Sequence, residues 1–240
     1  MMLRWRGIAF ALALVPGPML FAEEPETTTG EAVLAHFESH LASGDCDDAS
    51  ATWRRHYAPY VRRLIDPHDP ALARFDYVLS RITEAGLPSE YAVIPFVESH
   101  YEPDQRSSEG PSGLWQFTAQ TARMHGLHVG GGRDERLSME ASTRAAVTYL
   151  KTLHRQFGGN WRTTVMAYNA GDGRMRIAQR RGGAGLSFIT RTYPDKIHAI
   201  ACDILDHGDS ERWKAPLQRA LPRLQLPKVL QPKREPKPEP

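Results

Sequence analysis

The sequence predicts a mainly α-helical fold, with a helical extension before the main domain and a disordered, proline-rich tail after it. Apolar residues recur at the 3.6-residue period in several segments, and polar caps or glycines bracket those segments. No run of four to eight residues alternates apolar and polar side chains convincingly, as a strand would. The 240 residues, 41% of them hydrophobic, are enough for one substantial buried core with extensions.

The first 22 residues have the features of a secretory signal peptide. Arg4 and Arg6 precede the apolar run IAFALALV, which is too short to span a bilayer, and Gly17-Pro18 interrupt it before an expected cleavage site after Ala22. We therefore expect an exported protein, in the periplasm of a bacterium, with no transmembrane anchor. No cysteine lies near the cleavage site, so a lipid anchor is not expected either.

Residues 23–85 are expected to form a linker and an N-terminal helical extension. The stretch EEPETTTGE is polar and rich in turn formers, and a short segment over 32–41 follows it. The patterns WRRHYAPYVRRL and ALARFDYVLSRI predict two helices, separated by a turn at residues 66–70. Cys46, in this extension, either forms a disulfide with Cys202 or remains, like it, a buried thiol.

Residues 86–208 are expected to form the main domain. Residues 89–99 are apolar on nearly every face and predict a central helix that Pro95 kinks. The loop 127–137, with three glycines, is compatible with a small hairpin. Residues 209–240 form a C-terminal extension whose last part, LPKVLQPKREPKPEP, cannot build a core. Further helices are expected over 118–125, from Ser138 to Gly158, from about Asn160, and over 197–205 up to Gly208.

Charge and motif content exclude several classes of function. Without residues 1–22 the chain has 28 basic and 28 acidic residues, because the signal contains two arginines and no acid, and this neutrality argues against a nucleic-acid partner. The histidines show no metal-ligand spacing, so we expect no metal and no cofactor. There is no Gly-X-Ser-X-Gly elbow for a serine hydrolase, and Gly130-Gly131-Gly132 lacks the context of a phosphate loop.

Glu98 is the candidate catalytic residue. The stretch IPFVESHYEP places it at the end of an apolar run, where burial and the negative end of the helix dipole both raise the pKa of a carboxyl group. A carboxylic acid that stays protonated near neutral pH suits the cleavage of a glycosidic bond, whose leaving oxygen needs a proton. The alternative is that Glu98 is simply the first solvated residue where a core helix reaches the surface.

Five motifs occur in order over residues 87–205, about half of the chain. Together they resemble the lytic transglycosylases with a soluble-transglycosylase (goose-lysozyme-like) domain, and most closely the membrane-bound type D branch. The resemblance implies a lysozyme-like helical fold and cleavage of peptidoglycan glycan strands. The motifs are IPFVESHYEP, SSEGPSGLWQF, STRAAVTYLKTLHRQFGGNW, VMAYNAGDGR and TYPDKIHAI.

The resemblance also implies roles for individual residues. Glu98 would protonate the oxygen between N-acetylmuramic acid and N-acetylglucosamine, then accept the proton of the muramic acid 6-hydroxyl as a 1,6-anhydro ring forms. Trp115 would form a wall of the cleft without taking part in the chemistry. The residues implied to bind substrate or to lie against the acid are Ser99, Ser107, Gln116, Tyr168, Asn169 and Tyr193.

Several of these residues also have structural interpretations. Tyr168 could be an ordinary core aromatic, Gln116 could cap the following helix, and Ser107 could be an ordinary loop residue. Many relatives carry a glutamate where this chain has Ile189, which leaves open how the far side of the cleft is stabilised.

The implied reaction needs no second carboxylate, because the attacking hydroxyl belongs to the substrate. The nearby acids Glu102, Asp104 and Glu109 lie in a polar loop and are expected to stay solvated and ionised. Two alternatives remain: a goose-type lysozyme that uses Asp104 or Asp134 to position water, and a catalytically impaired wall-binding protein. The expected partners are glycan strands, together with proteins of cell-wall assembly or of a secretion system.

Overall fold

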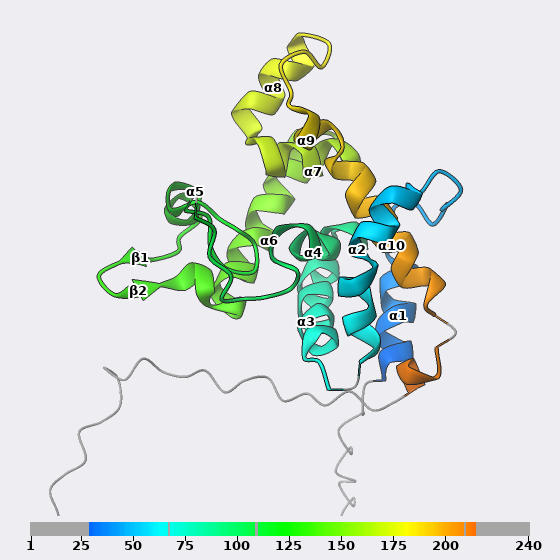
Figure 1. Cartoon of the computed structure of the whole chain (residues 1–240). Coiled ribbons are helices and arrows are strands. Elements are labelled where there is room, and N and C mark those ends of the chain that lie inside the picture. Colours follow the sequence, from blue (N-terminus) through cyan, green and yellow to red (C-terminus); the bar gives the residue numbers. More distant parts are fainter. Residues whose placement is uncertain (1–28, 67, 109, 209, 215–240) are drawn as a thin grey trace, which may run out of the picture.

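A computed structural model describes residues 29–66, 68–108, 110–208 and 210–214 of the chain (Figure 1). Within these residues the predicted mainly α-helical fold is confirmed. The predicted signal peptide and the proline-rich tail lie outside the described residues. The α-helices are α1 Gly30–Ser39, α2 Ala51–Val61, α3 Ala71–Glu84, α4 Ile94–Ser99, α5 Ala119–Met124, α6 Met139–Gln156, α7 Trp161–Ala170, α8 Asp172–Arg180, α9 Phe188–Arg191 and α10 Tyr193–Asp206.

The N-terminal extension contains the two predicted helices, α2 and α3, preceded by α1. The Oγ of Ser50 accepts a hydrogen bond from the backbone N–H of Trp53 and caps α2, whose last residues continue as a 3₁₀ turn over Arg62–Ile65. The apolar stripe of α3, which includes Phe75 and Ile82, is fully buried. Figure 1 shows α1, α2 and α3 side by side with α10, at one end of the molecule.

A disulfide joins Cys46 to Cys202, which decides the alternative that the sequence left open. It connects the loop before α2 to the middle of α10, across 156 residues of sequence. Two polar contacts reinforce the same junction: a 2.8 Å hydrogen bond between His198 and Asp48, and an ion pair between Arg54 and Asp206. The disulfide and these contacts therefore fix α2 against α10.

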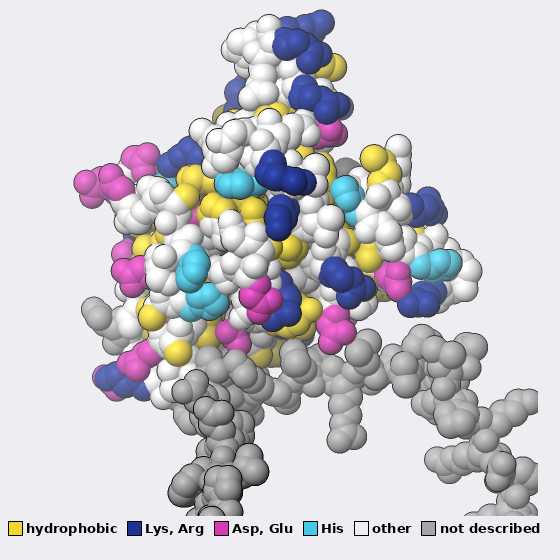
Figure 2. Space-filling model, turned by 180° about the vertical axis from the view of Figure 1, so that it is seen from behind, with side chains coloured by type: hydrophobic (Ala, Val, Ile, Leu, Met, Phe, Trp, Pro, Cys, Tyr) yellow, Lys and Arg dark blue, Asp and Glu magenta, His cyan; other side chains and the backbone are white. Residues whose placement is uncertain are grey.

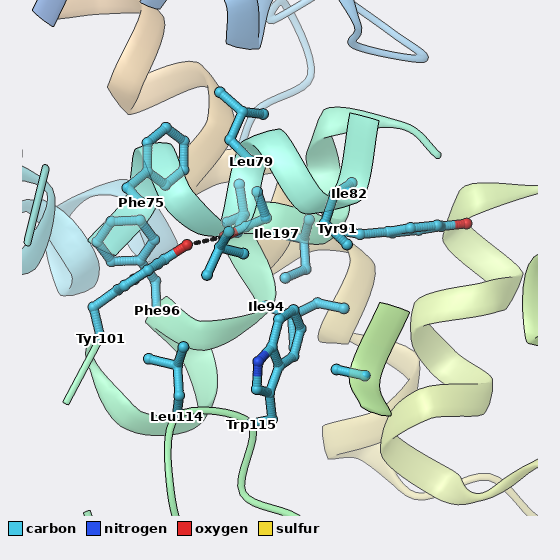
Figure 3. Close-up of a cluster of buried hydrophobic side chains, with 14 of the residues drawn as sticks. Phe75, Leu79, Ile82, Tyr91, Ile94, Phe96, Tyr101, Leu114, Trp115 and Ile197 are labelled. Carbon is cyan, nitrogen blue, oxygen red and sulfur yellow. Dashed lines mark hydrogen bonds between the residues drawn. The ribbon is translucent and has the colours of Figure 1, made fainter. Parts of the chain in front are cut away.

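The central segment differs from the single kinked helix that the sequence predicts. Ser89–Val93 form a 3₁₀ turn, and α4 begins at Ile94, so that Pro95 lies in the first turn of a new helix and does not kink an existing one. Both parts lie inside the main core, as Figure 3 shows, where Tyr101 donates a 2.7 Å hydrogen bond to the Ala92 carbonyl. This buried setting leaves only the far end of α4 to approach solvent.

The predicted elements between residues 118 and 160 are present. Ser138 accepts a hydrogen bond from the backbone N–H of Ala141 and starts α6, and Gly158 follows the end of that helix with φ +68°. Loop 127–137, whose sequence is compatible with a small hairpin, contains one: β1 Val129–Gly130 and β2 Arg133–Asp134 pair antiparallel. A 3₁₀ turn over Glu135–Leu137 leads into α6.

Two helices after α7 were not predicted, namely α8 and α9. The side chains of Met175 and Ala178 on α8 pack in a second apolar cluster, against Leu153, Phe157 and Leu186. The outward side of α8 is exposed and mostly polar, with Ile177 as an exposed apolar residue. Figure 1 shows α8 and α9 above α7, at the end of the molecule opposite α1 and α3.

The boundary expected between residues 85 and 86 stays a prediction. The main buried cluster contains residues on both sides of it, from Val33 to Trp213, so the extension and the main domain share one core. A last 3₁₀ turn, Glu211–Lys214, contributes Trp213 to this cluster. In the described part of the chain, no helix combines the length and apolar character needed to cross a bilayer.

Candidate active site

Glu98 lies in the last turn of α4, where the helix leaves the core. Ile94, Pro95 and Phe96 are buried, whereas Glu98 keeps partial exposure. The chain then reverses sharply, because His100 and Tyr101 both adopt positive φ angles, 53° and 63°. The carboxyl group therefore stands at the border between core and solvent.

The surroundings of Glu98 raise the pKa of its carboxyl group to about 7. The largest cause is desolvation by burial, which a hydrogen bond from Tyr193 and the charge of Lys196 partly oppose. At neutral pH a substantial fraction of the molecules therefore carries a protonated Glu98. This is the protonation state that a general acid needs.

Tyr193, at the start of α10, contacts the acid directly. Its hydroxyl donates a 2.5 Å hydrogen bond to Oε1 of Glu98, and its ring is buried. Burial and the nearby Glu98 charge raise the pKa of this phenol well above its usual value, so it stays a neutral donor. The contact joins residues 95 positions apart in the sequence.

Two further neighbours of Glu98 were missed from the sequence. The phenol of Tyr57, on α2, is buried, and its pKa rises to about 12 because of burial and the charge of Glu98. Lys196 lies one helical turn after Tyr193 on α10, and its Nζ is 4.7 Å from the centroid of the Trp53 ring. The i, i+3 spacing of Tyr193 and Lys196 was a usable signal, because such residues share a helix face.

Ser99 and Tyr168 hold the turn around Trp115. Burial and, next, the charge of Glu98 raise the pKa of the Tyr168 phenol well above its usual value, so Tyr168 lies near the acid. The buried Ser99 hydroxyl donates to the Leu114 carbonyl at 2.8 Å, and the Tyr168 hydroxyl donates to the Trp115 carbonyl at 2.7 Å. The Trp115 ring is 1% exposed, and its Nε1–H donates to Thr143, so the prediction that it forms a cleft wall is wrong. A core indole needs a buried partner for its N–H, which Thr143 provides.

The same turn brings Gln116 to the surface. Gly113 starts it with φ +80°, and a Cβ there would lie 1.8 Å from the Arg136 carbonyl oxygen, so only glycine fits. Gln116 has a positive φ of 47°, and its Nε2 donates to the Gly113 carbonyl at 2.8 Å. Its amide is therefore oriented by the backbone of its own turn and does not cap α5, which Thr118 caps.

Ser107 and Asn169 lie on two different elements. Ser107 is partly buried in the loop after α4, and its backbone N–H donates to the Pro111 carbonyl at 3.0 Å. Asn169, exposed on α7, accepts a 2.8 Å hydrogen bond from the hydroxyl of Thr190 on α9. Beside Thr190, the Ile189 side chain is 59% exposed, so this position presents an apolar group to solvent.

Two of the other candidate acids, Glu102 and Asp134, have ion-pair partners of their own. Glu102 is not simply solvated, as the sequence suggested, because it pairs with Arg63 at 2.6 Å and with Arg74 at 3.0 Å. Asp134 pairs with Arg136 at 2.8 Å, and Asp104 is exposed. Among the described residues, the groups that shift the pKa of Glu98 include no carboxylate. Among the residues the structure describes, no group of three or more His, Cys, Asp or Glu side chains could hold a metal ion.

Replacing Lys196 with Met is expected to shift the pH dependence of Glu98 upward. The ammonium lowers the pKa of Glu98, so its removal raises that pKa, and the protonated form persists to higher pH. The basic limb of the activity profile should move up by about half a unit to one unit. Lys196→Arg should keep the wild-type profile, as should Lys151→Met on the exposed side of α6; a downward shift in Lys196→Met would contradict the assignment.

Replacing Tyr193 with Phe is expected to lower kcat by about tenfold, with little change in KM. The variant loses the donor that stabilises the Glu98 carboxylate, so the same change raises the Glu98 pKa. Tyr101→Phe is the matched control, because it also removes a buried phenol hydrogen bond but lies in the core. Equal effects of the two variants on kcat would show that Tyr193 acts only through stability.

Comparisons with known proteins agree on one family. A family model described as Transglycosylase SLT domain matches residues 82–187. Membrane-bound lytic murein transglycosylase D of Escherichia coli K12 is 31% identical over 183 residues, which cover 70% of this chain and 40% of that protein. Soluble lytic murein transglycosylase of the same strain is 34% identical over 95 residues, covering 38% of this chain and 15% of the relative.

Among solved structures, the 70 kDa soluble lytic transglycosylase from Escherichia coli aligns over 75% of this chain and 33% of its own, with a TM-score of 0.43 and 22% identity. This chain thus spans less than half of the length of these relatives. Residues 82–187 are a transglycosylase SLT domain, and the chain belongs to the family of proteins that carry it.

Proposed function

We propose that this protein is a peptidoglycan lytic transglycosylase in which Glu98 acts first as the acid and then as the base. The observation that carries the proposal is the Glu98 carboxyl group itself: desolvated, with a pKa of about 7, and hydrogen-bonded by Tyr193. The membership of residues 82–187 in the SLT domain family and the lytic murein transglycosylases among the relatives support the substrate class.

The proposed reaction has two proton transfers through one carboxyl group. The Tyr193 hydroxyl donates its hydrogen bond to Oε1 of Glu98, so we place the transferred proton on Oε2 of the same carboxyl group. Protonated Glu98 donates this proton to the glycosidic oxygen as the bond to C1 of N-acetylmuramic acid breaks. The 6-hydroxyl of the same sugar attacks C1, the resulting carboxylate takes the hydroxyl proton, and a 1,6-anhydro ring remains. Atoms balance without water.

Within the proposed reaction, Glu98 is a carboxylate between these two transfers, and the site is suited to that charge. The Tyr193 hydroxyl and the Lys196 ammonium both favour the ionised form of Glu98, whereas burial disfavours it. The balance leaves the pKa near 7, so neither proton transfer faces a large energetic mismatch at neutral pH. If the pKa of Glu98 were near that of an exposed carboxyl group, few molecules would carry the protonated form at neutral pH.

Glycan cleavage in water enriched in ¹⁸O tests the proposal against the hydrolase alternative. The transglycosylase reaction should give products with no reducing end, lighter by one water than hydrolysis products and free of ¹⁸O. A goose-type lysozyme would incorporate one ¹⁸O at each new reducing end, and a wall-binding protein without activity would release nothing. No carboxylate in the described part of the chain shifts the pKa of Glu98, which favours the first outcome.

The proposed function implies export to the periplasm, because the glycan strands that the enzyme would cleave lie there. The Cys46–Cys202 disulfide supports it, since such bonds persist in oxidising compartments. Partners in cell-wall assembly or secretion remain predictions, as does the lack of a nucleic-acid partner.

A further inference from the structure

The segment from α8 to α9 is strongly basic. Residues 170–191 contain five arginines and one aspartate, a net charge of +4, whereas the whole chain has a formal net charge of +2. We call this segment the arginine lobe. Figure 2 shows Lys and Arg side chains gathered at the top of the molecule, the end at which Figure 1 places α8. The five arginines, all exposed, are Arg174, Arg176, Arg180, Arg181 and Arg191.

Most of this charge is not neutralised within the described part of the chain. Arg176 pairs with Asp172 at 3.1 Å, and Arg191 donates to the Leu186 carbonyl. Arg174, Arg180 and Arg181 have no acidic partner among the described residues. Arginines kept exposed and unpaired within one short segment create a positive potential that attracts anions. Guanidinium groups also match the geometry of carboxylates, which they can bind through two parallel hydrogen bonds.

The arginine lobe is attached directly to the proposed active site. Gly171 alone separates α8 from α7, whose Tyr168 hydroxyl holds the Trp115 carbonyl. On α9, Thr190 bonds Asn169, and only Thr192 separates this helix from Tyr193, the partner of Glu98. Both ends of the arginine lobe therefore join helices that carry residues of the candidate site.

The arginine lobe also exposes apolar side chains. Phe188 is 67% exposed, Ile189 59% and Ile177 44%, among the largest exposures of big hydrophobic residues in the described chain. A ligand suited to this surface combines carboxylates with small apolar groups. Peptide substituents of peptidoglycan have this composition, with free carboxylates and alanine methyl groups on a chain attached to the muramic acid lactyl group.

We propose that the arginine lobe binds the anionic stem peptides of peptidoglycan beside the scissile bond, so that the enzyme favours peptide-substituted glycan over bare glycan. This inference rests on the proposed function for its substrate, but the binding it describes does not require turnover. The lobe carries no group assigned to the chemistry, so it acts on the binding of substrate and leaves the catalytic step unchanged.

The variant Arg174→Glu/Arg180→Glu tests this proposal, since it changes the net charge of the lobe from +4 to 0. On intact peptidoglycan its KM should rise about tenfold with kcat within twofold, and the wild-type advantage should shrink as salt is added. On glycan stripped of peptides by an amidase, variant and wild type should behave alike. Arg144→Glu/Lys151→Glu, with the same charge change on the exposed side of α6, is the control and should resemble wild type on both substrates.

Binding measured without turnover separates this proposal from the proposed function. Full-length Glu98→Gln protein should bind intact peptidoglycan about tenfold more tightly than stripped glycan, and the two arginine substitutions should remove that difference. Equal losses on both substrates would overturn the proposal, as would a variant that loses kcat. Binding to vesicles with anionic phospholipid headgroups but not to soluble stem peptide would assign the lobe to a membrane surface and would also overturn it.

Discussion

Glu98→Gln should fold normally and lose nearly all cleavage of peptidoglycan, with the release of 1,6-anhydro products reduced by about three orders of magnitude or more. The amide keeps the shape of the side chain and can still accept the Tyr193 hydrogen bond, but it has no proton to donate at the glycosidic oxygen. Chromatography and mass spectrometry of the digest measure the loss. Glu140→Gln, an exposed acid on α6, is the control; turnover of Glu98→Gln within tenfold of wild type would remove Glu98 from the mechanism.

The same substitution should stabilise the fold at alkaline pH. The folded-state pKa of Glu98 is raised from 4.5 to about 7, so the unfolded chain releases the proton at lower pH than the folded one does. Stability therefore falls as pH rises from about 4.5 to 7, and the loss is complete above that window. Glutamine lacks this term, so Glu98→Gln should gain up to about 3 kcal/mol of unfolding free energy at pH 8 and nothing at pH 4, as urea unfolding would show.

Removal of the disulfide should have the second-largest effect. Cys46→Ser/Cys202→Ser releases a loop of 156 residues, for which the chain-entropy relation gives a loss of about 5 kcal/mol, a large part of the stability of a typical domain. Urea unfolding of oxidised wild type, reduced wild type and the variant measures it. The reduced wild type and the variant should agree; a loss below about 1 kcal/mol would mean that the other contacts between α2 and α10 suffice.

Elements with local signals were predictable from the sequence. Helix α6 begins at its Ser138 cap and ends just before Gly158, because capping and glycine stops depend on residues next to the helix. Helix α8 was missed because it buries only Met175 and Ala178, and their partners Leu153 and Phe157 come from a distant helix. Only tertiary packing makes so polar a segment helical.

In the candidate site, too, residues with a local sequence signal could be predicted, and residues brought in by tertiary packing could not. Glu98 could be identified, because the apolar run before it is continuous in sequence and implies burial. Tyr57 could not, since its proximity to Glu98 depends on how α2 packs. Lys196 had only an indirect signal, its i, i+3 spacing from Tyr193 on α10. The burial of Trp115 was missed for the same reason: the Thr143 hydroxyl that satisfies its N–H lies on α6.

The disulfide and polar contacts that fix α2 against α10 limit how the chain can be shortened without disturbing the site. Residues 82–187 hold Glu98, but the phenols of Tyr57 and Tyr193 and the ammonium of Lys196 lie outside that range, on helices that Cys46 and Cys202 bind together. A fragment trimmed to the bounds of the recognised domain would retain its acid and lose the environment that tunes it. A fragment meant to keep the environment of Glu98 therefore has to include α2 and α10.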